Sequence, residues 1–314
     1  MWFVFAVAAA TCFGMRGILY QWTSQRPLDR NLMLFGVYLS GTVIALAGNL
    51  FAGQAWSKGA MIGILIGAFS FVANAAMYKG YAVGKASLIA LFTGLPPVVV
   101  VIAAYLIWGE TLNAWQIFSF VIVIIGLLLI KYSQDLKQGQ LKGIQWGVLT
   151  MLFFSMTDLS SKQATLAGAN TFPLLSVMYG TGAILFGLQW AVSQYRTSKK
   201  IAGTPVQVAE AADGPVSNAA STSTGRTAAA PAQWSRGKTL GWGMFVGISN
   251  IAGMIFLIPA FRGGVTGIVS AISAMNVVFV LLYARFYLKE AMSPREIAGL
   301  STALIGILLL RLLA

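Results

Sequence analysis

The sequence contains no histidine, a single cysteine, Cys12, and few charged residues of either sign. One cysteine excludes an intrachain disulfide. Without histidine, a Cys/His zinc site, a Ser-His-Asp triad and a Cys-His dyad are excluded as well. Charged residues make up 9% of the 314 residues and hydrophobic residues 58%, whereas ordinary soluble domains carry about 25% charged residues. We therefore expect a membrane protein that is neither an enzyme nor the carrier of a cofactor.

Ten stretches of mostly apolar residues, each about the 20 residues that a membrane-spanning helix needs, cover nearly all of the chain. The predicted spans are 2–21, 32–52, 60–82, 85–107, 113–131, 143–165, 172–194, 240–261, 265–287 and 293–313. Residues 195–239 differ, because they are rich in Ala, Ser, Thr, Gly and Pro and hold only two aromatic residues, Tyr195 and Trp234. That composition cannot bury a core and predicts a disordered loop. The fold class indicated is an all-α integral membrane protein with ten transmembrane helices.

The distribution of basic residues predicts an orientation in the membrane. The net charge is +13, from 21 Lys and Arg against 8 Asp and Glu. Sixteen basic residues fall in the odd-numbered connections between the predicted spans and only three on the other side. Since cytoplasmic loops carry the excess of Lys and Arg, we expect the odd connections, including 195–239, in the cytoplasm and both termini outside. This placement explains the charge without a nucleic-acid partner.

An internal repeat divides the chain. An offset of 180 residues aligns 62–130 with 242–310 without a gap. The matched pairs include Gly67 with Gly247, Glu110 with Glu290 and Gly126 with Gly306. Each half then holds five spans, and because five is odd, the second half is expected to be inverted across the membrane. The predicted units are residues 1–132 and residues 143–194 plus 240–314. Gly67 and Gly247 are expected to let helix backbones approach closely.

The ends of the repeats carry helix-start signals. The spacings Asn113 to Gln116 and Ser293 to Glu296 are those of capping boxes. The preceding Glu110 and Glu290 are expected to stabilise the positive ends of these helices, with a proton-coupling or gating role left open. Earlier in the first repeat, Pro96 and Pro97 remove two backbone donors and predict a kink in the fourth span.

The end of the first half carries a set of motifs, Gly84-Lys85-Ala86-Ser87-Leu88, Pro97, Gly109-Glu110 and Gly126. Together they resemble the ending of an EamA-type repeat of the drug/metabolite transporter superfamily. The second half departs from the pattern, with Val277 in place of the proline and Lys289 in place of the glycine. The resemblance implies a bacterial plasma-membrane carrier, often an exporter of amino acids or other small metabolites, with a central cavity. It also implies cytoplasmic termini, which conflicts with the charge distribution.

Ionisable residues within spans are costly and usually face a cavity or a partner. Asp158 shares one face of the sixth span with Ser155, Ser161, Lys162 and Thr165. Asp158 and Lys162 either form a self-satisfied pair, with Lys162 extending to the membrane surface, or present a carboxylate and an amine to a substrate. Arg16, in the first span, either extends to the lipid headgroups or lines the same cavity at a different depth.

Neutral polar residues form further stripes along apolar helices, in the third, eighth and ninth spans. Their amides are expected either to join helices or to contact a ligand. The candidate substrate-binding residues are Asp158, Arg16, Lys162, Asn74, Tyr78, Asn250, Ser273 and Asn276, and the candidate gating or structural residues are Pro96, Pro97, Glu110, Glu290, Gly67 and Gly247.

The sequence thus predicts a secondary transporter that works by alternating access as a monomer. Its partners are membrane lipid and a small polar or amphipathic metabolite, such as an amino acid, which it exports. Coupling to a proton or another ion is left open, and no metal or nucleotide is expected. The alternative is a sensor or scaffold that recruits a partner through 195–239.

Overall fold

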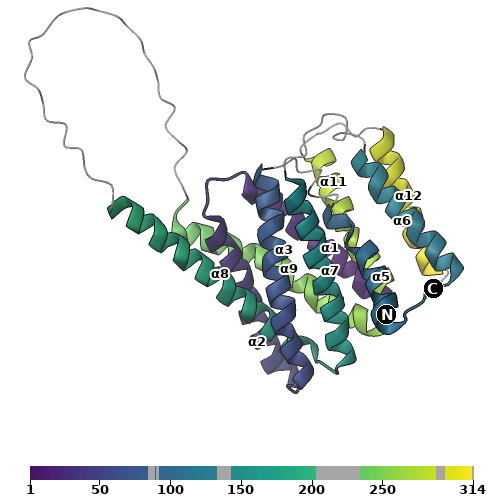
Figure 1. Ribbon diagram of the computed structural model, residues 1–314, viewed down its shortest axis with the longest axis horizontal. Coiled ribbons are helices and arrows are strands. Elements are labelled where there is room, and N and C mark those ends of the chain that lie inside the picture. Colours follow the sequence, from purple (N-terminus) through teal and green to yellow (C-terminus); the bar gives the residue numbers. More distant parts are fainter. Residues whose placement is uncertain (84–88, 90–91, 133–142, 203–233, 288–293, 313–314) are drawn as a thin grey trace, which may run out of the picture.

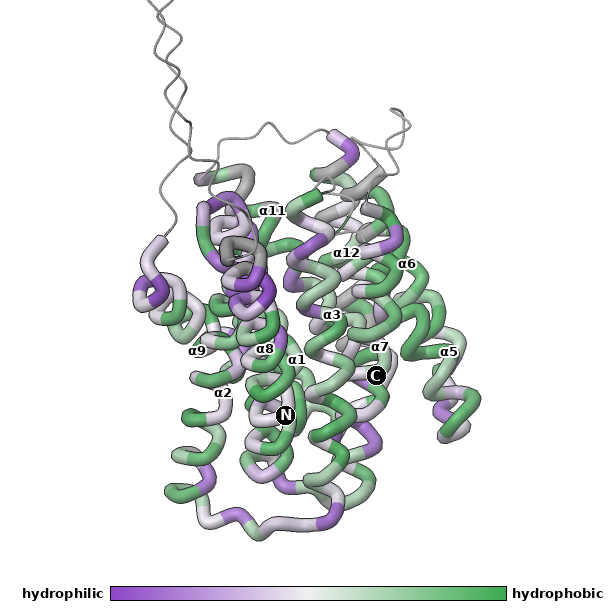
Figure 2. The backbone as a smooth tube through the Cα atoms, turned by 60° about the vertical axis from the view of Figure 1, so that its left-hand side comes forward, coloured by the Kyte–Doolittle hydropathy of each residue, from purple (hydrophilic) through white to green (hydrophobic). Residues whose placement is uncertain are grey.

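The computed structural model describes residues 1–83, 89, 92–132, 143–202, 234–287 and 294–312. Over this part of the chain the secondary structure is helical, and no strand occurs in it. The helices pack into one bundle (Figure 1). Apolar residues dominate along the helices in Figure 2. The structure thus confirms the predicted all-α fold class.

In the part of the chain that the structure describes, five helices are long and apolar enough to cross a membrane. They are α1 (Trp2–Ser24), α2 (Arg30–Ala52), η1 with α3 (Lys58–Ile62 and Gly63–Val83), the Thr171–Arg196 part of α8 (Thr171–Ala202) and α9 (Arg236–Gly263). The others are α5 (Pro96–Trp108), α6 (Ala114–Tyr132), α7 (Ile144–Leu166), α10 (Thr266–Ala274), α11 (Asn276–Phe286) and α12 (Pro294–Leu312). The α7 helix is as long as α1, with 23 residues each. Its polar residues lower its hydropathy below that of a typical span.

The fourth and ninth predicted spans are interrupted. The N–H of Leu95 donates to the carbonyl of Phe92 at 3.4 Å, and α5 begins at the next residue, as the two prolines predict. The expectation of one continuous helix over 265–287 is wrong, because α10 ends at Ala274 and α11 begins at Asn276. Between them, the N–H of Met275 donates to the carbonyl of Ile272 at 3.1 Å. This bond joins residues three apart, as in a 3₁₀ turn, and replaces the α-helical bond between residues four apart. Unlike the break at Leu95, it occurs without a proline.

Helices extend into both ends of the predicted loop 195–239. The α8 helix continues to Ala202, and α9 begins at Arg236, where the Ser235 hydroxyl accepts a hydrogen bond from the N–H of Lys238. This cap lets α9 start before the apolar residues do. Residues 203–233 lie outside the described residues. The N–H of Trp234 donates to the carbonyl of Pro27 at 2.8 Å, so this connection and the α1–α2 turn lie at the same end of the bundle.

Helix boundaries recur at the offset of the sequence repeat. Pro96 and Asn276 begin α5 and α11, and α6 and α12 likewise begin 180 residues apart, at Ala114 and Pro294. Corresponding helices also pack in matched pairs, because α2 contacts α8, α6 contacts α12, and the α1–α9 contact is matched by α3–α7. Figure 1 shows α6 and α12 side by side at one edge of the bundle.

Glycines allow several of these contacts. A methyl group added at Gly67 would collide with the carbonyl of Met178 in α8, and one at Gly247 with Ser40 and the carbonyl of Val37 in α2. At both positions the facing backbone lies where a side chain would have to be. The two glycines therefore occupy corresponding contacts, α3 with α8 and α9 with α2.

Candidate functional site: a polar cavity inside the bundle

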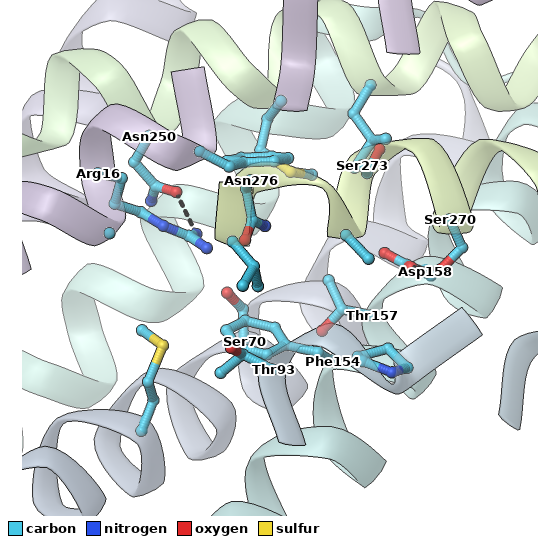
Figure 3. Close-up of a pocket in the computed structure, with 18 of the residues that line it drawn as sticks. Arg16, Ser70, Thr93, Phe154, Thr157, Asp158, Asn250, Ser270, Ser273 and Asn276 are labelled. Carbon is cyan, nitrogen blue, oxygen red and sulfur yellow. Dashed lines mark hydrogen bonds between the residues drawn. The ribbon is translucent and has the colours of Figure 1, made fainter. Parts of the chain in front are cut away.

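A cavity of about 90 Å³ lies between the helices. Its volume is enough for several water molecules or a small organic molecule. The walls come from α1, α3, α5, α7, α8, α9, α10 and α11, so helices of both predicted repeats contribute. The polar lining residues are Arg16, Ser70, Tyr81, Thr93, Thr157, Asp158, Asn250, Ser270, Ser273 and Asn276 (Figure 3).

Arg16 faces the cavity from α1. Its Nη1 donates to Oδ1 of Asn250 in α9 at 2.8 Å. The guanidinium lies over the rings of Phe13 and Phe154, at 4.7 and 5.7 Å from their centroids, where the ring quadrupoles favour a cation. Its buried Nε has no hydrogen-bond partner among the described residues. The alternative in which Arg16 extends to the headgroups is therefore wrong, because polar and aromatic contacts hold it inside the bundle.

Asp158 reaches the cavity from α7. Its Oδ2 accepts a hydrogen bond from the hydroxyl of Ser270 in α10 at 2.6 Å. The alternative in which Asp158 pairs with Lys162, one turn further along the same helix, is wrong. Lys162 instead forms an ion pair with Glu110, at 3.2 Å between Nζ and Oε1. Asp158 is left with a neutral partner in the described part of the chain.

The Glu110–Lys162 pair belongs to a network at one end of the bundle. Lys162 Nζ also donates to the carbonyls of Phe261 and Gly264, each at 3.1 Å. Glu110 accepts from the N–H and the hydroxyl of Thr266, at 2.8 and 2.9 Å. Glu110 thus caps α10 and not the helix that follows it in sequence, which corrects its expected place. A carboxylate is favoured there because the first N–H groups of a helix lack partners.

This network links the α5–α6 turn, α7 and the α9–α10 turn. We call this region, where α1 begins and α7 ends, the Glu110 end. Arg262 lies at the same end, because its Nη2 donates to the carbonyl of Ala169 in the α7–α8 turn at 2.7 Å. Lys162 is 8% exposed, so it does not extend to the membrane surface as the alternative for this residue supposed.

Other predicted residues lie elsewhere. Asn74 is buried and donates to the Tyr38 hydroxyl at 3.0 Å and to the carbonyl of Ser70 at 2.8 Å, which makes it a contact between α2 and α3. Tyr78 is buried and packs edge-on against Tyr20. Neither lines the cavity. Asn250, Ser273, Asn276 and Pro96 do line it, and Pro97 is buried in α5.

Two predicted helix starts have different outcomes. The capping box of α6 forms, because Gln116 N–H donates to Asn113 Oδ1 at 2.8 Å and Asn113 N–H to Gln116 Oε1 at 3.0 Å. Its counterpart begins at Ser293, which, like Glu290, falls outside the described residues. Pro294 is the first residue of α12, where its missing N–H costs no hydrogen bond.

The sequence did not single out Phe13, Phe154 and Thr157 as lining residues. Phenylalanines in an apolar helix carry no signal that separates a cavity wall from ordinary packing. Thr157 directly precedes Asp158, so only the rotation of α7 in the bundle shows that both reach the cavity. The signal that could have identified Phe13 was its place one turn before Arg16, within reach of the guanidinium.

The bundle and its cavity define a class of protein. A set of apolar helices around a cavity with Arg16 and Asp158 in its wall is typical of a multi-pass membrane protein. The EamA-like transporter family matches residues 1–132 and 215–312. The chain belongs to this family and is a membrane transporter.

A solved structure supports the fold. A chain described only as "Crystal structure of protein" aligns with a TM-score of 0.63 over 98% of this chain and 99% of that chain, at 16% sequence identity. At this identity the likeness shows the fold alone. No curated protein matches the sequence.

Proposed function

We propose that the protein is a secondary transporter that exports a small polar or amphipathic metabolite, such as an amino acid, across the bacterial plasma membrane. The observation that carries the proposal is the cavity, in which Arg16 from α1 and Asp158 from α7 line the same space. A carrier needs such a site between two parts of the molecule that move against each other. The protein acts as a monomer and needs neither a metal nor a nucleotide.

Ten spans in two inverted five-helix units, 1–132 and 143–194 plus 240–314, would supply the two moving parts. The recurring helix starts and the matched contacts support this arrangement. An odd number of spans in each unit inverts the second relative to the first. Two inverted units can exchange conformations, and this exchange opens the cavity first to one side and then to the other.

Opening at the Glu110 end would require the Glu110–Lys162 network to separate. It joins α7 to the α5–α6 turn and to the α9–α10 turn, which leads into the cavity-lining α10. Glu110 and Lys162 therefore act as a gate in this proposal, not as substrate ligands. The turns at Leu95 and Met275 are hinge candidates, because each interrupts a helix whose residues line the cavity.

Coupling to an ion is a further part of the proposal. Asp158 and Glu110 are the described carboxylates beside the cavity and its gate. A carboxylate that exchanges a proton at a different point of the cycle from the substrate couples the two fluxes. A pH gradient across proteoliposomes should then drive uptake without substrate on the other side, and uptake insensitive to the gradient would leave facilitated diffusion or exchange.

A counterflow experiment tests the transport function. Proteoliposomes loaded with an unlabelled metabolite should accumulate the same labelled metabolite, because exchange through one site concentrates the label. A panel of amino acids, amines and small carboxylates covers the chemistry that Arg16 and Asp158 suggest. Arg26→Gln, which removes an exposed cation far from the lining residues, is the control and should accumulate as the wild type does. Accumulation equal to that in empty liposomes for the whole panel would contradict the proposal.

A deletion distinguishes the transporter from the alternative of a scaffold protein. Replacing 203–233 by a short Gly/Ser linker leaves the described helices and the Trp234–Pro27 contact in place. A transporter should keep its counterflow in this variant, since no described cavity residue lies in the deleted segment. A scaffold that recruits its partner through this segment would lose its activity instead.

A further inference from the structure

Arg16 and Asp158 occupy the same position in corresponding helices. The α1 and α7 helices each contain 23 residues, Trp2–Ser24 and Ile144–Leu166. Arg16 is the fifteenth residue of α1, and Asp158 is the fifteenth residue of α7. The partner helices correspond as well, because α1 packs on α9 and α7 packs on α3. The two repeats therefore place opposite charges at matched positions.

The two helices run in opposite directions. Trp2 at the start of α1 lies against Gly264, and the Gly264 carbonyl accepts a hydrogen bond from Lys162 near the end of α7. At 1.5 Å per residue, Arg16 lies about 21 Å from the start of α1 and Asp158 about 12 Å from the end of α7. The charges are therefore offset by roughly 9 Å along the bundle.

Each of the two charges has a neutral partner. Arg16 bonds to the amide of Asn250 and keeps a free Nε, and Asp158 bonds to the hydroxyl of Ser270. No ion pair joins either to another residue in the part of the chain that the structure describes. Charges inside an apolar bundle are stabilised most by an opposite charge. A ligand that brings a carboxylate to Arg16 and an ammonium group to Asp158 gives each of these residues an opposite charge.

The charge balance of the cavity points the same way. Lys162 and Glu110 neutralise each other, and Arg16 and Asp158 sum to zero. A lone anion or cation would satisfy one of the cavity charges and leave the other unmatched, whereas a zwitterion leaves none. Figure 3 shows Arg16 with Asn250 on one side of the view and Asp158 with Ser270 on the other, with Thr157 and Asn276 between them.

We propose that the cavity selects small zwitterions and holds them in one orientation, with the anionic group at Arg16 and the cationic group at Asp158. The inference rests on the transport function proposed above and adds the charge pattern of the substrate and the two residues that read it. Thr157 and Asn276 supply polar contacts for the segment between the two charges.

Matched probes test the charge pattern. Each set consists of an amino acid, the amine that lacks its carboxylate and the carboxylic acid that lacks its amino group, such as alanine with ethylamine and propionate. A series of ω-amino acids of increasing length measures the best charge spacing. Binding is followed by thermal stabilisation of the detergent-solubilised protein, and flux by counterflow. The wild type should prefer the best zwitterion over its amine and its acid by about tenfold or more, because each lost charge-assisted contact costs about 1.5–3 kcal/mol.

Charge-removing variants should change this preference in opposite directions. Arg16→Gln should favour the amine over the zwitterion, and Asp158→Asn should favour the acid. The charge-retaining Arg16→Lys and Asp158→Glu should keep the zwitterion first, which provides the readout if a neutral variant does not fold. Arg26→Gln is the matched control for loss of an exposed cation and should keep the wild-type order.

The outcomes separate this inference from the transport function. Charge-selective binding without counterflow would keep the site and overturn transport. Counterflow in which amines, acids and zwitterions move equally well, or in which both neutral variants keep the wild-type order, would overturn the inference and keep transport. Failure of the folded wild type to bind or move any zwitterion would overturn the inference.

Discussion

Lys162 forms its ion pair with Glu110, at 3.2 Å, whereas Asp158, one turn away on the same helix, bonds to Ser270 at 2.6 Å. The two carboxylates near the cavity therefore differ in their surroundings. Glu110 has a cationic partner and two hydrogen bonds from Thr266. Asp158 has one neutral partner and faces the cavity. The first arrangement suits a structural or gating role, and the second suits a ligand.

The effects of Glu110 and Lys162 substitutions on stability should depend strongly on each other. Glu110→Gln removes the carboxylate and leaves the buried ammonium of Lys162 with carbonyl partners only, so we expect a loss of about 3 kcal/mol or more. Adding Lys162→Met should recover part of this loss, since no buried charge is left unpaired. Thermal denaturation in detergent measures both variants. Strictly additive losses would show that the pair contributes nothing as a pair.

Asp158 should matter for transport more than for stability. Asp158→Asn keeps the volume and the contact with Ser270 while removing the charge, so we expect counterflow of the best substrate to fall about tenfold with little change in expression. Adding Lys162→Met should not restore the flux, because the charge partner of Lys162 is Glu110. Restored flux in the double variant would show that Asp158 acts through Lys162.

The glycines at the two corresponding helix contacts should be intolerant of side chains. Gly67→Leu and Gly247→Leu should each lower stability by at least 1–3 kcal/mol, roughly the usual cost of overpacking, because the facing backbone cannot move aside locally. Ile125→Leu is the control, since the Ile125 side chain is 46% exposed on α6. Equal melting temperatures for the three variants would refute the packing role.

Accessibility to an impermeant thiol reagent tests the orientation. In a Cys12→Ala background, a cysteine at Ala167, exposed in the α7–α8 turn, should react in intact cells. A cysteine at Gln25, exposed after α1 at the opposite end, should react only after lysis. Ala169 is fully buried and would give no signal on either side. The reverse pattern would support the cytoplasmic termini that the family resemblance implies.

The helical class and the interruption at Pro96 could be predicted from the sequence. In an apolar run long enough to cross a bilayer, the backbone N–H and C=O groups can form their hydrogen bonds within a helix. Proline has no backbone N–H and so interrupts that pattern at any position inside a helix. The break at Met275 lacks such a residue. Its only sequence signal is the alignment of Asn276 with Pro96, which does not fix where the helix ends.

The candidate site was predictable as a set of residues but not as an arrangement. An ionisable residue within an apolar helix indicates a cavity or a partner, and on this basis Arg16, Asp158 and Lys162 stood out. The sequence offered Asp158, four residues away, as one alternative partner for Lys162, because that contact is local. Glu110, on another segment, became its partner only when α5, α7 and α10 packed together.

The sequence by itself determined which segments are helices and where costly polar groups sit in them, because both follow from local composition. The tertiary structure decided which of these groups meet. A helix exposes its residues around its whole circumference, so the rotation that sends Asn74 into a helix contact and Asn250 to Arg16 depends on the neighbouring helices. Arg16 in α1 and Asp158 in α7 line one cavity for the same reason, since the packing of the two helices among their neighbours brings both residues to one space.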